Sequence, residues 1–373
     1  MRVAFIVGPA GKAYIDTYND TFKITNSRPW LKDVPRSLLV NENGTKKLPR
    51  EYVRIDHAVA YCIKYFLRKS KTIKFLIVPA DKVDGSLIRT SDFIFWHFYD
   101  KLVRPAPAAL SYKREPNGKY QKLIDSGGSK MFPPIKYQHM VYDKCAYYKF
   151  FEKNGINTAP TICLTRKQWV KSPKKSVELV WAKSQIWKQT FGKPVHGTDS
   201  GDVGRPWDLD TRSKVEEYIR NVFSNPNRYP SIVFQKFMKD FELTFPQIRM
   251  YYLGNTYQYS VVEWKTPLPN GTSRLADARD ADFIRKAKRF ASKVLKTVEP
   301  FYKGSPKFLT RIDVGCCIKD GIITNPNLFL NELEVLAGLY LFYDGERRQS
   351  FDVKMAKQAI KVINYHKKNI ATK

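Results

Sequence analysis

Two segments near the end of the chain constrain its fold more than any other feature. Residues 308–314 and 328–335 are mainly apolar, and a turn-rich gap separates them. The first segment contains Asp313, and the second contains Glu332 and Glu334. Because side chains on a β-strand alternate between its two faces, Glu332 and Glu334 should project together. If the two segments pair as a hairpin, Asp313 can join them on the same face.

Three carboxylates on one face of a sheet repel each other unless a cation lies between them. Hard oxygen ligands of this kind suit Mg²⁺ or Mn²⁺, with nucleotide phosphates completing the coordination shell. The pattern therefore predicts a metal site formed by Asp313, Glu332 and Glu334. The alternative is a set of solvated acids on an edge strand, which requires no ligand.

The length and composition of the chain favour a protein with more than one lobe. A chain of 373 residues, of which 43% are hydrophobic, can bury two or three cores. No apolar run is long enough to span a bilayer, so we expect no membrane span. The five cysteines are odd in number and form no Cys-x-x-Cys pair, which predicts free thiols in a reduced, cytoplasmic setting. The five histidines are scattered, so a zinc site is not expected.

The net charge of +30 is extreme, and lysine and arginine are spread over the whole chain. Such a field attracts polyanions and steers acidic ligands toward the protein. Anionic small molecules and non-specific nucleic acid binding are both compatible with it. A generally basic protein without a dedicated anionic partner is the alternative.

The pattern of apolar residues predicts an N-terminal α/β lobe. Short strands are expected at residues 3–7 and 73–78, with a helix at 56–67 between them. Residues 105–134 are rich in proline and glycine and are expected to form a linker or loop. Asp143 is a plausible cap for a helix over residues 144–153.

The rest of the chain alternates between helical and extended patterns. Apolar residues at helical spacing predict helices at 212–223, 282–298 and 353–363. Strands are expected at 231–237, 247–253 and 256–262, the last two joined by a turn at Gly254.

Three further motifs precede the acidic strands. Asp143 and Lys144 open a helix that leads into the sequence GINTAP at residues 155–160. Residues 186–192 contain Lys188 in a segment expected to be a strand, and a glycine-bearing loop follows at 192–204. A strand lysine and the backbone N–H groups of such a loop can meet the same phosphate. The third motif is residues 232–238, which Glu242 and Arg249 follow.

In this order the motifs resemble the ATP-grasp superfamily of carboxylate–amine ligases. The resemblance covers roughly residues 140–340 and rests on the four motifs together. It implies an α/β protein in which an N-terminal α/β lobe precedes a two-lobed ATP-grasp fold. The implied boundaries are an N-terminal substrate lobe at 1–140, a small lobe with the glycine loop at 141–230, and a large lobe with the metal site and C-terminal helix at 231–373.

The resemblance also implies roles for individual residues. ATP is the implied cofactor, with Mg²⁺ or Mn²⁺ held by the three carboxylates. The residues implied to bind ATP are Lys144 and Lys188 at the phosphates, Gln235, Lys236, Phe237 and Met238 at the adenine, and Glu242 at the ribose. The residues implied to act on the reacting groups are Arg249, near the γ-phosphate and acyl phosphate, and Lys265 and Arg274, facing the substrates.

The sequence departs from the superfamily pattern at two places. The last metal position is commonly asparagine, but Glu334 stands there. The glycine loop is interrupted, so Lys193 is a rival to Lys188 for the phosphate, and Lys183 is a weaker one. The implied activity is ATP-dependent ligation of a carboxylate to an amine, on substrates that the charge suggests are anionic small molecules or peptides. The alternatives are a kinase of a polyanionic small molecule and a non-catalytic, basic nucleic-acid-binding protein.

Overall fold

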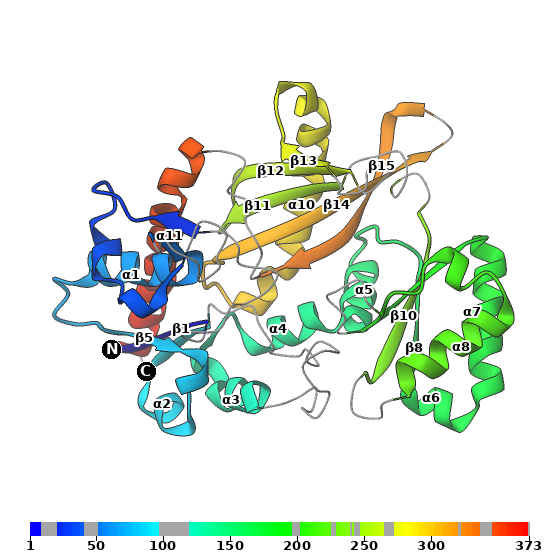
Figure 1. The fold of residues 1–373 in the computed structure, drawn as a ribbon, viewed down its shortest axis with the longest axis horizontal. Helices are drawn as coiled ribbons and strands as arrows, with labels where there is room; N and C mark the ends of the chain where they lie inside the picture. The colour runs from blue at the N-terminus through cyan, green and yellow to red at the C-terminus, as the bar shows by residue number, and fades with distance from the viewer. Residues whose placement is uncertain are drawn as a thin grey trace.

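The computed structural model describes residues 1–8, 21–40, 51–96, 119–195, 202–224, 229–238, 241, 247–264, 272–319, 322–335 and 345–371. Three parts lie side by side in Figure 1, with the N-terminal lobe on the left and a small lobe on the right. A five-stranded sheet with its long helix lies between them at the top of the view. Both chain termini lie in the N-terminal lobe. No helix in the described ranges is long and apolar enough to cross a membrane.

The N-terminal lobe is built on a sheet of order β5-β1-β6-β7, in which all pairs are parallel. The central strand β1 (Arg2–Val7) is buried from Val3 to Val7, as expected for a strand covered on both faces. A small antiparallel sheet of order β2-β4-β3 lies beside it. The other elements are β2 (Thr21–Lys23), β3 (Leu39–Val40), β4 (Tyr52–Arg54), α1 (Ile55–Leu67), β5 (Lys74–Pro79), α2 (Gly85–Thr90), β6 (Phe93–Trp96), α3 (Lys119–Gly127), β7 (Met131–Phe132) and α4 (Ile135–Tyr142).

The small lobe is an antiparallel sheet of order β8-β10-β9, packed against helices with its own hydrophobic core. It begins at α5, whose cap is confirmed: the Asp143 carboxylate accepts hydrogen bonds from the N–H groups of Cys145 and Ala146. Gly155, just after α5, has a φ of +70°, a conformation that favours glycine. The elements are α5 (Lys144–Lys153), β8 (Thr161–Thr165), α6 (Arg166–Lys171), α7 (Pro173–Trp187), β9 (Thr190–Pro194), α8 (Arg212–Phe223) and β10 (Ser231–Lys236).

The five-stranded sheet has the order β13-β12-β11-β14-β15, and every pair in it is antiparallel. Its strands are β11 (Gln247–Leu253), β12 (Thr256–Trp264), β13 (Thr272–Leu275), β14 (Leu309–Lys319) and β15 (Ile322–Glu334). The predicted pairing of the two acidic segments is thus confirmed, although both strands are longer than expected. Helix α10 (Ala281–Tyr302) shares a core with Ile312 and Val314 of β14. Because strand residues alternate, the residues between them point to the other face.

The last helix, α11 (Gly345–Ala371), runs back to the N-terminal lobe and lies beside α1 (Figure 1). The Asp352 carboxylate accepts a hydrogen bond from the Trp30 indole at 3.1 Å and lies 3.4 Å from the Arg28 guanidinium. Farther along the helix, the Gln358 amide donates to the Lys307 carbonyl in the central sheet region. Helix α11 therefore joins the first and third regions of the chain.

We expect His366 on α11 to make stability depend on pH. Its ring stacks on Phe93 at 4.3 Å, and burial lowers its pKa from 6.5 to about 4. Because the unfolded chain binds this proton and the folded chain does not, unfolding should become easier as pH falls from 6.5 toward 4. Denaturation of His366→Phe across this range should show a smaller loss than the native chain. Equal pH slopes for the two proteins would contradict the assignment.

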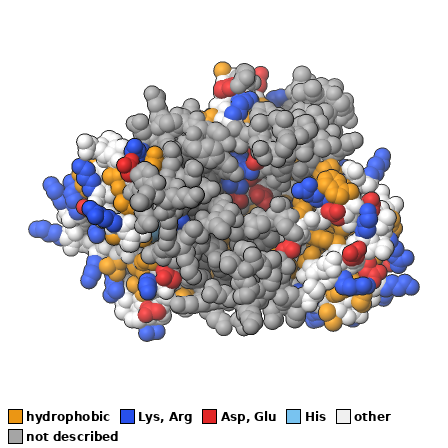
Figure 2. Space-filling view, viewed as in Figure 1, with side chains coloured by type: hydrophobic (Ala, Val, Ile, Leu, Met, Phe, Trp, Pro, Cys, Tyr) orange, Lys and Arg blue, Asp and Glu red, His pale blue; other side chains and the backbone are white. Residues whose placement is uncertain are grey.

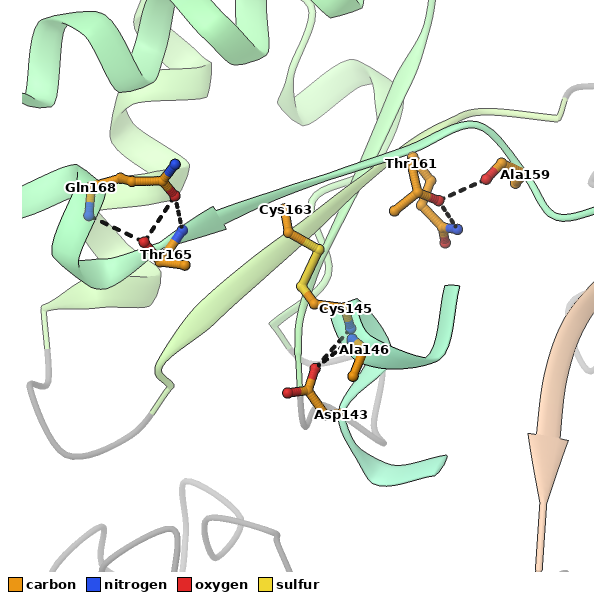
Figure 3. The surroundings of a disulfide bond; sticks show 9 residues. Asp143, Cys145, Ala146, Ala159, Thr161, Cys163, Thr165 and Gln168 are labelled. Atoms are coloured by element: carbon orange, nitrogen blue, oxygen red, sulfur yellow. Dashed lines mark hydrogen bonds between the residues drawn. A yellow bond between two sulfur atoms is a disulfide. The ribbon is translucent and has the colours of Figure 1, made fainter. Parts of the chain in front are cut away.

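The prediction of free thiols is wrong for two of the cysteines. Cys145 of α5 and Cys163 of β8 form a disulfide with a Cα–Cα distance of 6.0 Å (Figure 3). An odd count says nothing about which thiols the fold brings together, and these two lie 18 residues apart in sequence. Cys62 and Cys316 are buried and lie outside this disulfide. The disulfide ties the start of α5 to the small-lobe sheet.

Reduction of this disulfide should destabilise the protein. A cross-link that closes a loop of this length contributes about 3 kcal/mol, mainly by restricting the unfolded chain. Urea unfolding with and without reductant measures the difference. A Cys145→Ser/Cys163→Ser variant is the control, because it should match the reduced native protein and be insensitive to reductant. A native midpoint that does not move on reduction would show that the bond contributes nothing.

Candidate active site

The three predicted carboxylates come together at the paired ends of β14 and β15. Asp313 lies directly opposite Glu332, and Arg311 lies opposite Glu334. A bulge interrupts the register between Asp313 and Val314, so that Gly315 faces Phe329. Residues paired across two strands share a face. The regular register places Glu332 and Glu334 on the same face as Asp313, away from α10, and the bulge brings Phe329 to that face as well.

A guanidinium lies among these carboxylates. Arg311 is buried, and its Nε and one terminal nitrogen each lie 2.8 Å from an Asp313 oxygen. The same terminal nitrogen donates to Glu334 at 2.8 Å. The cation that the three acids require is thus partly supplied by the protein itself, from a residue that the sequence analysis did not select.

The neighbouring strands β11 and β12 add a second layer of polar residues. Arg249 lies opposite Asp313, and its guanidinium contacts the Glu263 carboxylate and lies 4.0 Å from an Asp313 oxygen. The buried Gln247 amide donates to Asp313 at 2.7 Å. Arg249, which the sequence analysis did select, therefore reaches the carboxylate cluster.

The charge of the cluster is compatible with a divalent cation. The cluster has an excess of two negative charges when its carboxylates are ionised. These carboxylates belong to Asp313, Glu332, Glu334 and Glu263, and the offsetting cations are Arg249 and Arg311. Burial raises the pKa of Glu334 to about 7; Arg311 opposes this rise, and Glu332 adds to it. Carboxylate oxygens are the donors that Mg²⁺ prefers. As placed, however, no group of three or more His, Cys, Asp or Glu among the described residues could hold a metal. Arg311 forms hydrogen bonds to both Asp313 and Glu334. Holding a metal would require Arg311 to share these ligands.

Lys193 of β9 connects the small lobe to this cluster. Its ammonium, which is buried, donates to the Tyr148 hydroxyl at 2.9 Å. The Tyr148 hydroxyl in turn donates to the carbonyl of Asn331, the residue before Glu332. The chain of contacts runs from β9 through α5 to β15. It places a lysine of the small lobe near the acids of the central sheet.

The two lysines selected from the sequence lie in different settings. Lys188 is exposed and has a φ of +66° at the end of α7. The prediction of a strand around Lys188 is therefore wrong, and the strand of this segment, β9, begins at Thr190. The lysine on the strand is Lys193. Lys144 is half-buried at the first position of α5, and its N–H donates to the carbonyl of Val195 at 3.4 Å. The weaker rival, Lys183, lies inside α7.

The predicted hinge, residues 235–238, covers the end of β10 and the two residues after it, and it contacts both lobes. The Gln235 amide is buried and donates to the Thr161 hydroxyl at 2.9 Å, while Lys236 is exposed. The Phe237 N–H donates to the Gln189 carbonyl. Met238 packs against a small apolar cluster formed by Ala159, Phe241 and Phe329. This cluster joins residues of both lobes on the carboxylate face.

The position of Phe329 depends on Gly315. A Cβ at Gly315 would overlap the Phe329 ring, so one of them would have to move. Gly315→Ala should therefore displace Phe329 and cost about 1–3 kcal/mol of stability through overpacking. Chemical denaturation measures the loss. Adding Phe329→Leu to Gly315→Ala should recover part of it, and strictly additive losses would contradict the contact.

The structure does not bring every selected residue to the carboxylate face. Arg274 lies opposite Val262, on the other face of the sheet, where it pairs with Asp280 at 2.6 and 2.9 Å. Glu242 and Lys265 lie outside the described residues, as does most of the glycine-bearing loop, residues 196–201. Figure 2 views the same side of the molecule as Figure 1. Acidic and basic side chains meet there at the centre, between residues drawn in grey.

Several residues of this region, including Glu263, were not predicted from the sequence. Arg311 lies two positions before Asp313, so strand alternation alone could have placed it on the acidic face. Gln247 has the same relation to Arg249. No local signal pointed to Tyr148 or Phe329, because their places depend on how the lobes pack.

Searches of family models and of curated protein sequences give no match to this chain. Solved structures do match its fold. The D-cycloserine synthetase DcsG is 12% identical, with a TM-score of 0.56 over 95% of this chain and 99% of that chain. D-alanine–D-alanine ligase from Bacillus anthracis is 12% identical, with a TM-score of 0.53 over 99% and 98% of the two chains. The VanG D-Ala:D-Ser ligase from Enterococcus faecalis is 9% identical, with a TM-score of 0.54 over 98% and 99%.

These similarities define the class of fold. The chain has the ATP-grasp fold that its motifs resemble, with a mixed α/β architecture. The structural neighbours are ligases and synthetases, and one solved structure of the Bacillus anthracis ligase is a complex with ATP.

Proposed function

We propose that this protein is an ATP-dependent ligase that joins a carboxylate to an amine and releases ADP. The observation that carries the proposal is the convergence of Lys193, Arg249 and Arg311 with Asp313, Glu332 and Glu334 between the two sheets. Cations beside carboxylates are what a site for metal-bound triphosphate requires. The ligases among the structural neighbours support this class of reaction.

Each group has a proposed role. Lys193 and Lys144 bind ATP phosphates, and the segment from Gln235 to Met238 holds the adenine beside the apolar cluster at Phe329. With Arg311 sharing its two carboxylates, Asp313, Glu332 and Glu334 would hold one or two Mg²⁺ or Mn²⁺ ions, which would neutralise phosphate charge. Arg249 and Arg311 orient the carboxylates and face the transferring phosphoryl group. Glu242 at the ribose and Lys265 near the substrates remain predictions from the resemblance. Arg274 lies on the other face of the sheet and is given no role at this site.

The proposed chemistry asks for positioning and charge stabilisation. An oxygen of the substrate carboxylate attacks the γ-phosphorus, the bond to ADP breaks, and an acyl phosphate forms. The amine nitrogen then attacks the acyl carbon, inorganic phosphate leaves, and the nitrogen loses a proton. Fixed cations near the phosphoryl oxygens stabilise the charge that develops in both steps.

The net charge of +30 favours an anionic substrate, which is compatible with acidic small molecules or peptides and also with phosphoryl transfer to a polyanion. Incubation with ATP, Mg²⁺ and pooled amino acids, acidic peptides and polyphosphorylated small molecules distinguishes the two reactions. ADP release with a product that has the mass of a condensation supports ligation. ADP release with a gain of one phosphate supports a kinase instead. Sequence-selective nucleic acid binding with no ADP release would favour a non-catalytic protein.

A further inference from the structure

A basic cavity lies at the opposite end of β11 from the carboxylate cluster. It has a volume of ≈ 820 Å³ and lies between the β11–β12 turn, the last turns of α10, the segment after α10 and the middle of α11. Four lysines line it: Lys296, Lys303, Lys307 and Lys361. Glu299 is the single acid among the described lining residues. The volume is in the range of small-molecule sites.

Lys307, one of the lysines that line this cavity, is held in place by hydrogen bonds within the protein. The Lys307 side chain is 3% exposed, and its ammonium donates to Asn255 at 2.9 Å and to Glu299 at 3.2 Å. An ammonium has three N–H donors, so the described contacts leave one for another acceptor. The hydrogen bond from Lys307, together with its positive charge, lowers the pKa of Glu299, and this carboxyl is ionised at neutral pH.

The other three lysines are not explained by helix capping. At the end of α10, the Tyr302 carbonyl accepts from the Ser305 N–H, and the Lys303 carbonyl accepts from the Tyr365 hydroxyl. Among described residues, no hydrogen bond or ion pair engages the ammonium of Lys303 or Lys361, and both side chains are exposed. Lys296 is also exposed. Several like charges around one cavity repel each other, and a bound anion relieves that repulsion.

We propose that this cavity binds a small polyanion, namely a molecule carrying two or more phosphate groups, at a site separate from the carboxylate cluster. With Glu299 ionised, the four lysines leave an excess of three positive charges, which one phosphate group cannot neutralise. The cavity is a partly open recess, which suits a compact polyphosphate better than a duplex, since a duplex needs an extended basic surface. Because α11 also contacts the N-terminal lobe, the bound molecule would link two regions of the chain.

Inorganic tripolyphosphate is the probe for this site. Titration calorimetry on the full chain, with a non-hydrolysable ATP analogue at saturation, should detect one saturable site that weakens as salt is added. Lys303→Glu/Lys361→Glu should weaken this site about tenfold or more, which corresponds to losing one charge-assisted contact. Lys171→Glu/Lys174→Glu, on α6 and α7 of the small lobe, changes the net charge equally and should leave the affinity within about twofold.

A gain of affinity gives an independent test. Glu299→Gln removes the one acid while keeping its shape, so tripolyphosphate should bind more tightly. Equal losses in both lysine double variants, or no saturable binding beside the ATP analogue, would overturn the proposal. Duplex DNA that binds with the same affinity and the same loss in Lys303→Glu/Lys361→Glu would also overturn it, in favour of a polymer-binding surface. Because the readout is binding, the result does not depend on the proposed ligase activity.

Discussion

Replacing Glu332 with glutamine should reduce ATP turnover by at least about 10²-fold with little change in stability. The expected size is that of removing one fixed electrostatic group from a reacting centre. Glu332 is the best test of the proposed metal site because Asp313 and Glu334 also bind Arg311. Asp313→Asn would leave a buried guanidinium without its partner, and loss of fold would then mix with loss of activity.

The measurement is ADP release by native protein and Glu332→Gln, with circular dichroism to check the fold. Glu178→Gln is the matched control, because it makes the same chemical change on the exposed surface of α7. It should retain full turnover. Full turnover in Glu332→Gln would exclude this residue from the metal site.

Replacing Lys193 with methionine should weaken ATP binding by about 1.5–3 kcal/mol, or roughly 10- to 150-fold in Kd. The reason is that Lys193 is the buried lysine tied through Tyr148 to the strand that carries Glu332. Lys188→Met should have little effect, since Lys188 is exposed at the end of α7. Tyr148→Phe should give an intermediate loss, because the ring remains while the hydroxyl that positions Lys193 is removed.

Calorimetric titration of ATP against the three variants compares them directly, with thermal unfolding to check that each is folded. Normal binding in Lys193→Met together with weak binding in Lys188→Met would reverse the assignment. Lys188, the residue that the motif alone suggested, would then be the lysine that binds the ATP phosphates.

The local sequence was sufficient for most elements of the fold. Helix α5 with its Asp143 cap, helix α8 and the β11–β12 hairpin follow from patterns within a few residues of each other. The pairing of β14 with β15 also followed, because two apolar segments with acids at alternating positions favour one register. The order of the motifs along the chain then indicated the ATP-grasp fold.

The sequence was less reliable wherever a residue's place depends on a distant partner. It put a strand around Lys188, but the strand lies a few residues later and carries Lys193, because α7 continues to Trp187 before the chain enters the sheet. It treated the cysteines as free, but folding brings Cys145 beside Cys163.

What the sequence by itself determined is the set of chemical groups, namely three acids at strand spacing and an excess of lysine and arginine. What only the tertiary structure decided is which groups meet. Arg311 lies between Asp313 and Glu334 because the antiparallel register of β14 and β15 places it opposite Glu334. Arg274 pairs with Asp280 because it falls on the opposite face of the sheet. The periodicity along one strand determines which of its residues share a face of the sheet. Which residue lies opposite on the next strand depends on packing between segments that are far apart in sequence.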